Sequence, residues 1–175
     1  MEPEVHIIER YFQVVLGCLT MTNILLEHRR EIDVLAMNPK TLERYHIEVN
    51  AWTCEKVKQE DLGDFQEDKF EHPTVRQRIR ELFGDVAYHK VLVVWNIKND
   101  QVINAAKEKF GIEIRYMQEI LEELREAVFR GKIKGSRDDI LRTVELVNKS
   151  YEIARKKSIS RKIDELDRKY ATTIG

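Results

Sequence analysis

Two acidic residues and one amide lie in a pair of neighbouring apolar segments, and their types suit a metal site. Asp33 interrupts the apolar run 32–37, while Glu48 and Asn50 alternate with apolar residues over 44–52. Because successive side chains of a strand point to opposite faces, Glu48 and Asn50 share one face. A carboxylate inside an apolar strand is costly unless something compensates it, and two carboxylates on adjacent strands repel each other. The pattern therefore predicts that a cation holds the two carboxylates together.

The elements that must position these residues follow from hydrophobic periodicity and from turn residues. We expect helices over 3–16, 74–83, 101–110 and 117–129, and strands over 18–27, 31–37, 44–52, 91–95 and 112–116. The strand over 91–95 is a continuous apolar run, which is typical of a strand buried on both faces. The polar segment 53–71 is expected to be a loop or a mobile excursion. The order αβββαβαβα predicts an α/β fold.

Asp33, then a turn and most of a strand, then Glu48 resembles the motif of the PD-(D/E)xK nuclease superfamily. Restriction endonucleases and archaeal Holliday-junction resolvases belong to that superfamily, and the element order over about residues 5–130 is similar to theirs. The resemblance implies a restriction endonuclease-like fold, with a mixed central sheet flanked by helices. It also implies a metal-dependent endonuclease that hydrolyses DNA phosphodiester bonds with Mg²⁺ or Mn²⁺.

The resemblance implies a role for each residue of the motif. Asp33 and Glu48 would bind the metal, and the backbone carbonyl of Val49 would complete a half-open site of hard oxygen ligands. Glu9, at the edge of the apolar face of the first helix, would extend the site directly or through water; a solvated glutamate is the alternative. Asn50 stands where the family has the catalytic Lys, and it can orient a water but carries no charge.

Two explanations of the missing lysine remain open. A lysine from elsewhere can take its place, either from Lys40 on the turn or from Lys56, Lys58 or Lys69 in the following segment. Alternatively, the fold has lost catalysis and serves as a nucleic-acid- or protein-binding module.

The ordinary alternatives to a metal site are also open. Asp33 would then form a salt bridge with Arg29 or Arg30, and Glu48 would occupy an exposed strand position. His46 shares the face of Glu48, where it would either support the site or be a polar residue on a half-exposed strand.

Composition limits the class of protein. The chain has 175 residues, of which 42% are hydrophobic and 35% charged, so we expect amphipathic helices with solvated faces. No apolar run approaches the roughly 20 residues that span a bilayer, and the acidic start 1–6 lacks the basic segment of a signal peptide. Cys18 and Cys54 are isolated, which favours a reducing, cytoplasmic setting.

The last part of the chain differs in charge from the first. Residues 131–175 contain 12 basic and 7 acidic residues, whereas residues 1–130 contain 18 basic and 24 acidic residues. We therefore divide the chain into a core, 1–130, and a charged helical extension, 131–175. Apolar residues at heptad spacing in the extension predict helices that pack on the same chain or form a homodimer: Ile140, Val144, Val147, Tyr151, Ala154, Ile159, Ile163, Leu166 and Tyr170. Basic residues that would contact a DNA backbone are Arg76, Arg78, Arg80, Lys156, Lys157, Arg161 and Lys162.

Overall fold

The computed structural model describes residues 2–27, 30–50, 56–130, 138–147 and 149–150. The chain divides into two compact units, Met1–Ala127 and Val128–Gly175. The helices are α1 (Pro3–Val14), α2 (Asp61–Phe65), the π-helix η2 (Gln66–Phe70), α3 (Pro73–Phe83), α4 (Asp100–Phe110) and α5 (Met117–Phe129). The strands are β1 (Leu19–Leu25), β2 (Glu31–Met37), β3 (Arg44–Asn50), β4 (Lys56–Val57), β5 (His89–Val94), β6 (Asn96–Ile97) and β7 (Ile112–Tyr116).

A five-stranded mixed sheet forms the centre of the first unit, in the order β1-β2-β3-β5-β7. The three strands of the meander, β1 to β3, pair antiparallel, whereas β3, β5 and β7 pair parallel. Parallel neighbours need a crossover connection, and α4 provides the crossover from β5 to β7. The expected α/β class with helices flanking a mixed sheet is confirmed. The short strands β4 and β6 form a separate parallel pair.

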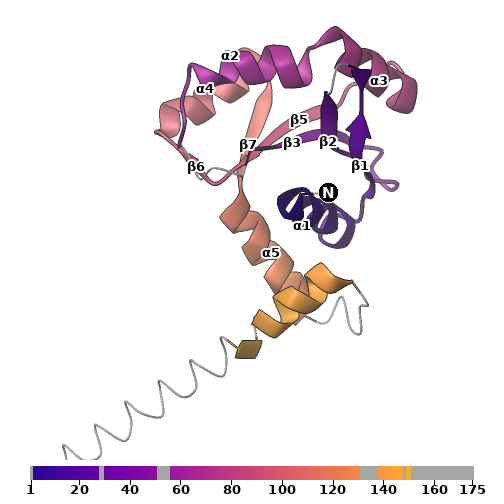
Figure 1. The fold of residues 1–175 in the computed structure, drawn as a ribbon, viewed down its shortest axis with the longest axis vertical. Coiled ribbons are helices and arrows are strands. Elements are labelled where there is room, and N and C mark those ends of the chain that lie inside the picture. Colours follow the sequence, from indigo (N-terminus) through magenta and orange to yellow (C-terminus); the bar gives the residue numbers. More distant parts are fainter. Residues whose placement is uncertain (1, 28–29, 51–55, 131–137, 148, 151–175) are drawn as a thin grey trace, which may run out of the picture. The chain divides into compact units, whose positions relative to one another are not determined.

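Helices cover both faces of this sheet (Figure 1). On one face, α1 and α5 pack against Val34, Ile47 and Val93. On the other face, α2, η2 and α4 pack against Leu92 and Val94, and α3 packs against β1 and β2. Strand β5 therefore contributes buried side chains to both layers, as its continuous apolar run predicts.

The segment predicted as a loop over 53–71 is helical in its second half, so that prediction is wrong there. Residues 61–70 form α2 followed directly by η2. Leu62 and Phe70 are fully buried and anchor the segment to the cluster around Leu92. Phe65 packs on the same cluster, and the charged residues between these apolar positions obscure the helical pattern. Residues 51–55 lie outside the described part of the chain.

In the second unit the structure describes a helix over 139–147. Ile140, Val144 and Val147 of the predicted heptad pattern lie on this helix, and Val147 is exposed. The rest of the pattern, from Tyr151 onward, lies outside the described residues, so a homodimer through the extension stays a prediction. Among the helices that the structure describes, none has the length and apolar character to cross a membrane.

Candidate functional site

The sheet opens between β2 and β3 at the level of Asp33. The antiparallel register runs from Met37 opposite Arg44 to Val34 opposite Ile47 and ends there. Beyond that point the side chain of Asp33 replaces the backbone partner, because its Oδ2 accepts a hydrogen bond of 2.7 Å from the Val49 N–H. The N–H and C=O of one strand residue point to the same edge, so the Val49 carbonyl is directed into the same gap as the Asp33 carboxylate.

The other neighbour of β2 is also irregular at this level. In the register of β1 with β2, Thr22 lies opposite Val34 and Ile24 opposite Ile32, which leaves Asn23 and Asp33 without a ladder pairing. Asn23 has a φ of 49°, in the left-handed region that residues other than glycine seldom adopt. Such a conformation within a strand interrupts the ladder locally, and it does so beside the carboxylate.

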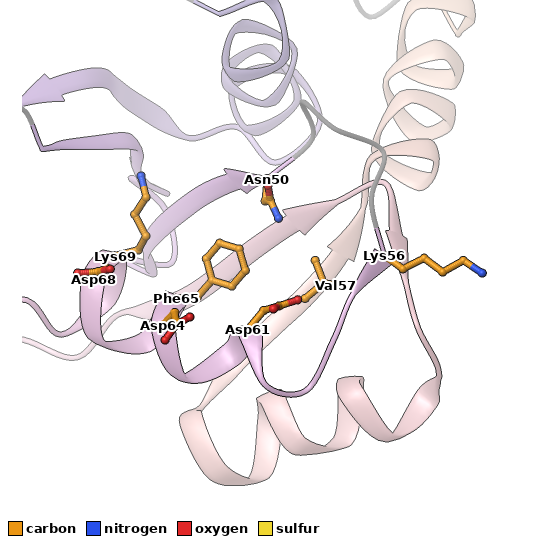
Figure 2. Close-up of a pocket in the computed structure, with 8 residues that line it drawn as sticks. All are labelled: Asn50, Lys56, Val57, Asp61, Asp64, Phe65, Asp68 and Lys69. Atoms are coloured by element: carbon orange, nitrogen blue, oxygen red, sulfur yellow. The ribbon is translucent and has the colours of Figure 1, made fainter.

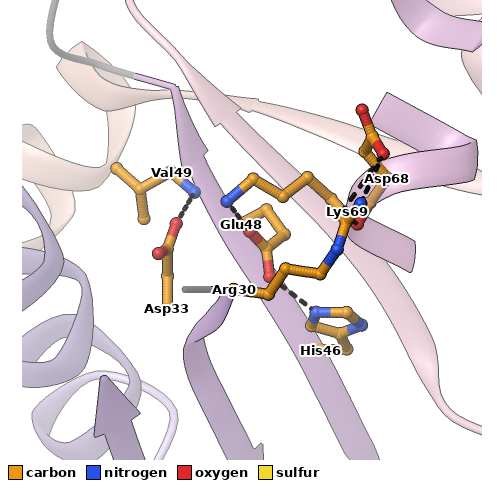
Figure 3. Close-up of polar contacts among 7 residues, drawn as sticks. All are labelled: Arg30, Asp33, His46, Glu48, Val49, Asp68 and Lys69. Carbon is orange, nitrogen blue, oxygen red and sulfur yellow. Dashed lines mark hydrogen bonds and ion pairs between the residues drawn. The ribbon is translucent and has the colours of Figure 1, made fainter. Parts of the chain in front are cut away.

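Glu48 is buried, with 1% of its surface exposed, and both of its carboxylate oxygens face nitrogen atoms. His46 Nε2 lies 2.7 Å from Oε1, and Lys69 Nζ lies 3.2 Å from Oε2 (Figure 3). The expectation of an exposed strand position is therefore wrong for Glu48. His46 itself is completely buried, so it is not a half-exposed polar residue either.

The alternative partners proposed for Asp33 are not found in the described residues. Arg30 donates hydrogen bonds to the carboxylate and the backbone carbonyl of Asp68 instead. Arg29 lies outside the part of the chain that the structure describes. Asp33 is 6% exposed, and the hydrogen bond that it accepts is a dipolar contact with the Val49 N–H rather than an ion pair with an arginine.

Among the candidate lysines in the described residues, Lys69 is the one within ion-pair distance of Glu48. It extends from η2 to Glu48, while the neighbouring Asp68 is held by Arg30 on the β1–β2 connection (Figure 3). Of the other lysines considered, Lys58 pairs with Glu60. The π-helical turn adds a residue to the register of the helix, and such turns are frequent at functional sites.

Asn50 and Lys69 line a cavity of about 460 Å³, and Lys69 also contacts Glu48. Phe65 of α2 lies opposite Asn50 across this cavity, and Lys56 extends away from Asn50 (Figure 2). The remaining lining residues are Val57, Asp61, Asp64 and Asp68. Asp33 and Glu48 are not among the residues that line this cavity, and Lys69 is the lining residue that contacts Glu48.

Burial and neighbouring charges shift the pKa values of Asp33 and Lys69. Burial, together with the neighbouring Glu48 charge, raises the pKa of Asp33 to about 7, although the Val49 N–H and Lys69 act in the opposite direction. Burial lowers the pKa of Lys69, but the charges of Glu48 and Asp33 outweigh it and raise that pKa above its ordinary value. Lys69 thus stays protonated, and in the state in which both carboxylates are ionised the three groups carry a net negative charge.

The residues present fit a divalent cation. Mg²⁺ and Mn²⁺ prefer oxygen ligands, and the gap between β2 and β3 offers two carboxylates and the Val49 carbonyl. Glu48 Oε2 is buried and has no hydrogen-bond partner among the described residues, although Lys69 is within ion-pair distance. A cation bound between the two carboxylates would offset their repulsion and would lower the cost of ionising Asp33.

Glu9 is not brought to this gap. Its Oε1 accepts hydrogen bonds from Gln13 and Thr20, which hold the side chain between α1 and β1. The described residues contain no group of three or more His, Cys, Asp or Glu side chains placed to hold a metal ion. The expected extension of the site by Glu9 is therefore not supported, because Gln13 and Thr20 satisfy its carboxylate locally.

The arginines predicted to contact DNA lie in ion pairs on and around α3. Arg76 pairs with Glu71, Arg78 with Glu81 and Arg80 with Asp85. In each pair the carboxylate offsets the positive charge of the arginine, which is the charge that would attract a phosphate backbone. The basic residues 156, 157, 161 and 162 lie outside the described residues.

Two functional residues were missed or undervalued in the sequence. Lys69 was one of several candidates, because the helix that carries it was not predicted; the apolar spacing of Leu62, Phe65 and Phe70 was the available signal. The burial of His46 had no local signal, since it depends on which elements cover its face of the sheet. Comparisons with models of protein families, with curated proteins and with solved structures found no match for this chain.

Proposed function

We propose that this protein is a divalent-metal-dependent nuclease that hydrolyses phosphodiester bonds in DNA. The observation that carries the proposal is the pair of buried carboxylates, Asp33 and Glu48, facing one gap in the sheet with the Lys69 ammonium on Glu48. An acidic pair of this kind is costly to bury, and a bound cation would offset that cost.

The sheet order supports a restriction endonuclease-like fold for the proposed enzyme. An antiparallel meander leads into parallel strands, and the two carboxylates lie on the second and third strands of that meander. This is the arrangement that the resemblance to the PD-(D/E)xK superfamily implies. Fold alone does not determine function, so the proposal depends on the chemistry of the gap.

Each residue has a definite task in the proposed reaction. Asp33, Glu48 and the Val49 carbonyl would hold the metal, which when bound stabilises charge on the phosphate and lowers the pKa of an attacking water. Lys69 replaces the motif lysine: its retained charge faces the carboxylates and would stabilise the negative charge that develops on the phosphate. Asn50 borders the same cavity and would hold a water through its amide group.

The test is cleavage of a panel of linear, flapped and four-way DNA with Mg²⁺ or Mn²⁺. Asp33→Asn, Glu48→Gln and Lys69→Met should each abolish metal-dependent cleavage or reduce its rate by at least about a hundredfold. Lys58→Met is the matched control, because it removes a lysine from the same segment that pairs only with Glu60. This control should cut at the rate of the unmodified protein.

Two outcomes would contradict the proposal. If cleavage persists in Asp33→Asn and Glu48→Gln, the gap is not the site of catalysis. If no substrate is cut and the three variants bind DNA as the unmodified protein does, the alternative of a non-catalytic binding module is the better description.

A further inference from the structure

A fully buried histidine lies behind the proposed metal ligand Glu48. His46 is on β3, two residues before Glu48 and on the same face of the strand, with none of its surface exposed. The rings of Phe70 and Tyr88 surround it, with centroids 4.8 and 6.1 Å from the imidazole centroid. Its one polar contact with a side chain described here is the 2.7 Å hydrogen bond to Glu48.

We infer that His46 is a positioning residue, which fixes the Glu48 carboxylate so that Oε2 faces the gap where the metal would bind. The inference rests on the proposed function, because it concerns the same metal site. It adds to that proposal a residue that touches neither metal nor substrate.

The direction of the hydrogen bond supports this role. When Glu48 is ionised its carboxylate only accepts hydrogen bonds, and Nε2 of His46 is then the donor to Glu48 Oε1. The opposite nitrogen, Nδ1, is buried without a partner among the described residues. The ring thus uses one nitrogen for Glu48 and leaves the other without a partner among the described residues; that folding cost calls for an explanation, and a functional purpose of the contact to Glu48 would provide one.

The geometry around Glu48 explains what that purpose is. Oε1 is held by His46 from β3 and Oε2 lies next to Lys69 from η2, so the carboxylate cannot rotate without losing one of these contacts. Lys90 lies opposite His46 in the register with β5, but its ammonium pairs with Glu71 and does not compete for the imidazole. Groups that orient metal ligands in this way commonly change metal affinity by about ten- to a hundredfold when they are removed.

Two amide variants separate positioning from simple polarity. In His46→Gln the amide nitrogen lies the same number of bonds from Cβ as Nε2, so the donor to Glu48 is kept. In His46→Asn the amide lies at the place of Nδ1, which has no partner. Titration calorimetry on the full chain measures the Mn²⁺ affinity. This affinity should fall about ten- to a hundredfold in His46→Asn and less than about threefold in His46→Gln.

Ile47→Val is the control for a general loss of packing. Ile47 lies between His46 and Glu48, is fully buried and packs on the opposite face of the sheet. This variant should unfold at a lower denaturant concentration than the unmodified protein and bind Mn²⁺ equally well. Equal Mn²⁺ affinity of both His46 variants, whether both match the unmodified protein or both are weakened, would overturn the inference.

A measurement on the unmodified protein covers the case in which His46→Asn does not fold. Nitrogen-15 spectra of the histidine rings should show His46 protonated at Nε2, with a ring signal that shifts when Mg²⁺ is added. Two results would overturn the positioning role but leave the metal site standing. One is protonation of His46 at Nδ1; the other is a His46 signal that does not shift although Mg²⁺ binds to the protein. A lack of any Mg²⁺ or Mn²⁺ binding by the unmodified protein would overturn the metal site itself and the inference with it.

Discussion

Replacing Asp33 by Asn should stabilise the metal-free protein at neutral and alkaline pH, because it removes a charge that is buried beside Glu48. The pKa of Asp33 rises from its ordinary value of 3.8 to about 7 in the folded protein. At pH values between these two pKa values, the folded state binds more protons at Asp33 than the unfolded chain does. The free energy of unfolding therefore falls as the pH rises through this interval.

The size of the effect follows from the same two values. At about 1.4 kcal/mol per tenfold change in proton affinity, ionising Asp33 costs the folded state up to about 4 kcal/mol above pH 7. An asparagine keeps an oxygen that can accept the Val49 N–H, so little is lost in exchange. Asp33→Asn should thus match the unmodified protein near pH 4 and exceed it by about 2–4 kcal/mol at pH 8.

Urea denaturation in the presence of EDTA, repeated from pH 4 to pH 8.5, measures this difference. Asp64→Asn is the matched control, because Asp64 lines the neighbouring cavity but is exposed. Its stability relative to the unmodified protein should not depend on pH in this way. Added Mg²⁺ at about a hundred times its dissociation constant should stabilise the unmodified protein by about 2.7 kcal/mol and should not stabilise Asp33→Asn.

One result would refute the reasoning. If Asp33→Asn is less stable than the unmodified protein at pH 8, or if the difference between them is the same at pH 4 and pH 8, then Asp33 is not a buried carboxylate held at the cost of stability. The electrostatic argument for a cation in the gap would then lose its main support.

Three further substitutions probe how the site is assembled. Arg30→Gln should change the free energy of unfolding by no more than about 1 kcal/mol but slow DNA cleavage, because it releases the turn that carries Lys69. Arg78→Gln, which breaks another ion pair on the surface, should change neither quantity markedly. Adding Asn50→Lys to Lys69→Met should restore part of the lost cleavage rate, since it returns an ammonium to the face of Glu48; no recovery would contradict the exchange of roles. Glu9→Gln should leave the Mn²⁺ affinity measured by calorimetry unchanged, and a tenfold loss would show that Glu9 does belong to the site.

Strong local patterns made much of the fold predictable. The bounds of β2 over 31–37, β7 over 112–116 and α5 over 117–129 match their expected ranges. Periodicity is recorded in consecutive residues, so it can be recognised without knowledge of the rest of the chain. The two carboxylates could be found in the same way, because an acidic residue inside an apolar strand is unusual wherever the strand lies.

The sequence alone therefore determined the five strands of the central sheet, their order along the chain and the candidates Asp33 and Glu48, but not the short strands β4 and β6. The tertiary structure decided which other groups join them: Lys69 and His46 lie at Glu48, whereas Glu9 is held by Gln13 and Thr20. These contacts depend on how η2 and α1 pack against the two faces of the sheet. Packing joins residues that are distant in sequence through burial and charge, and no local periodicity records which side chains will meet.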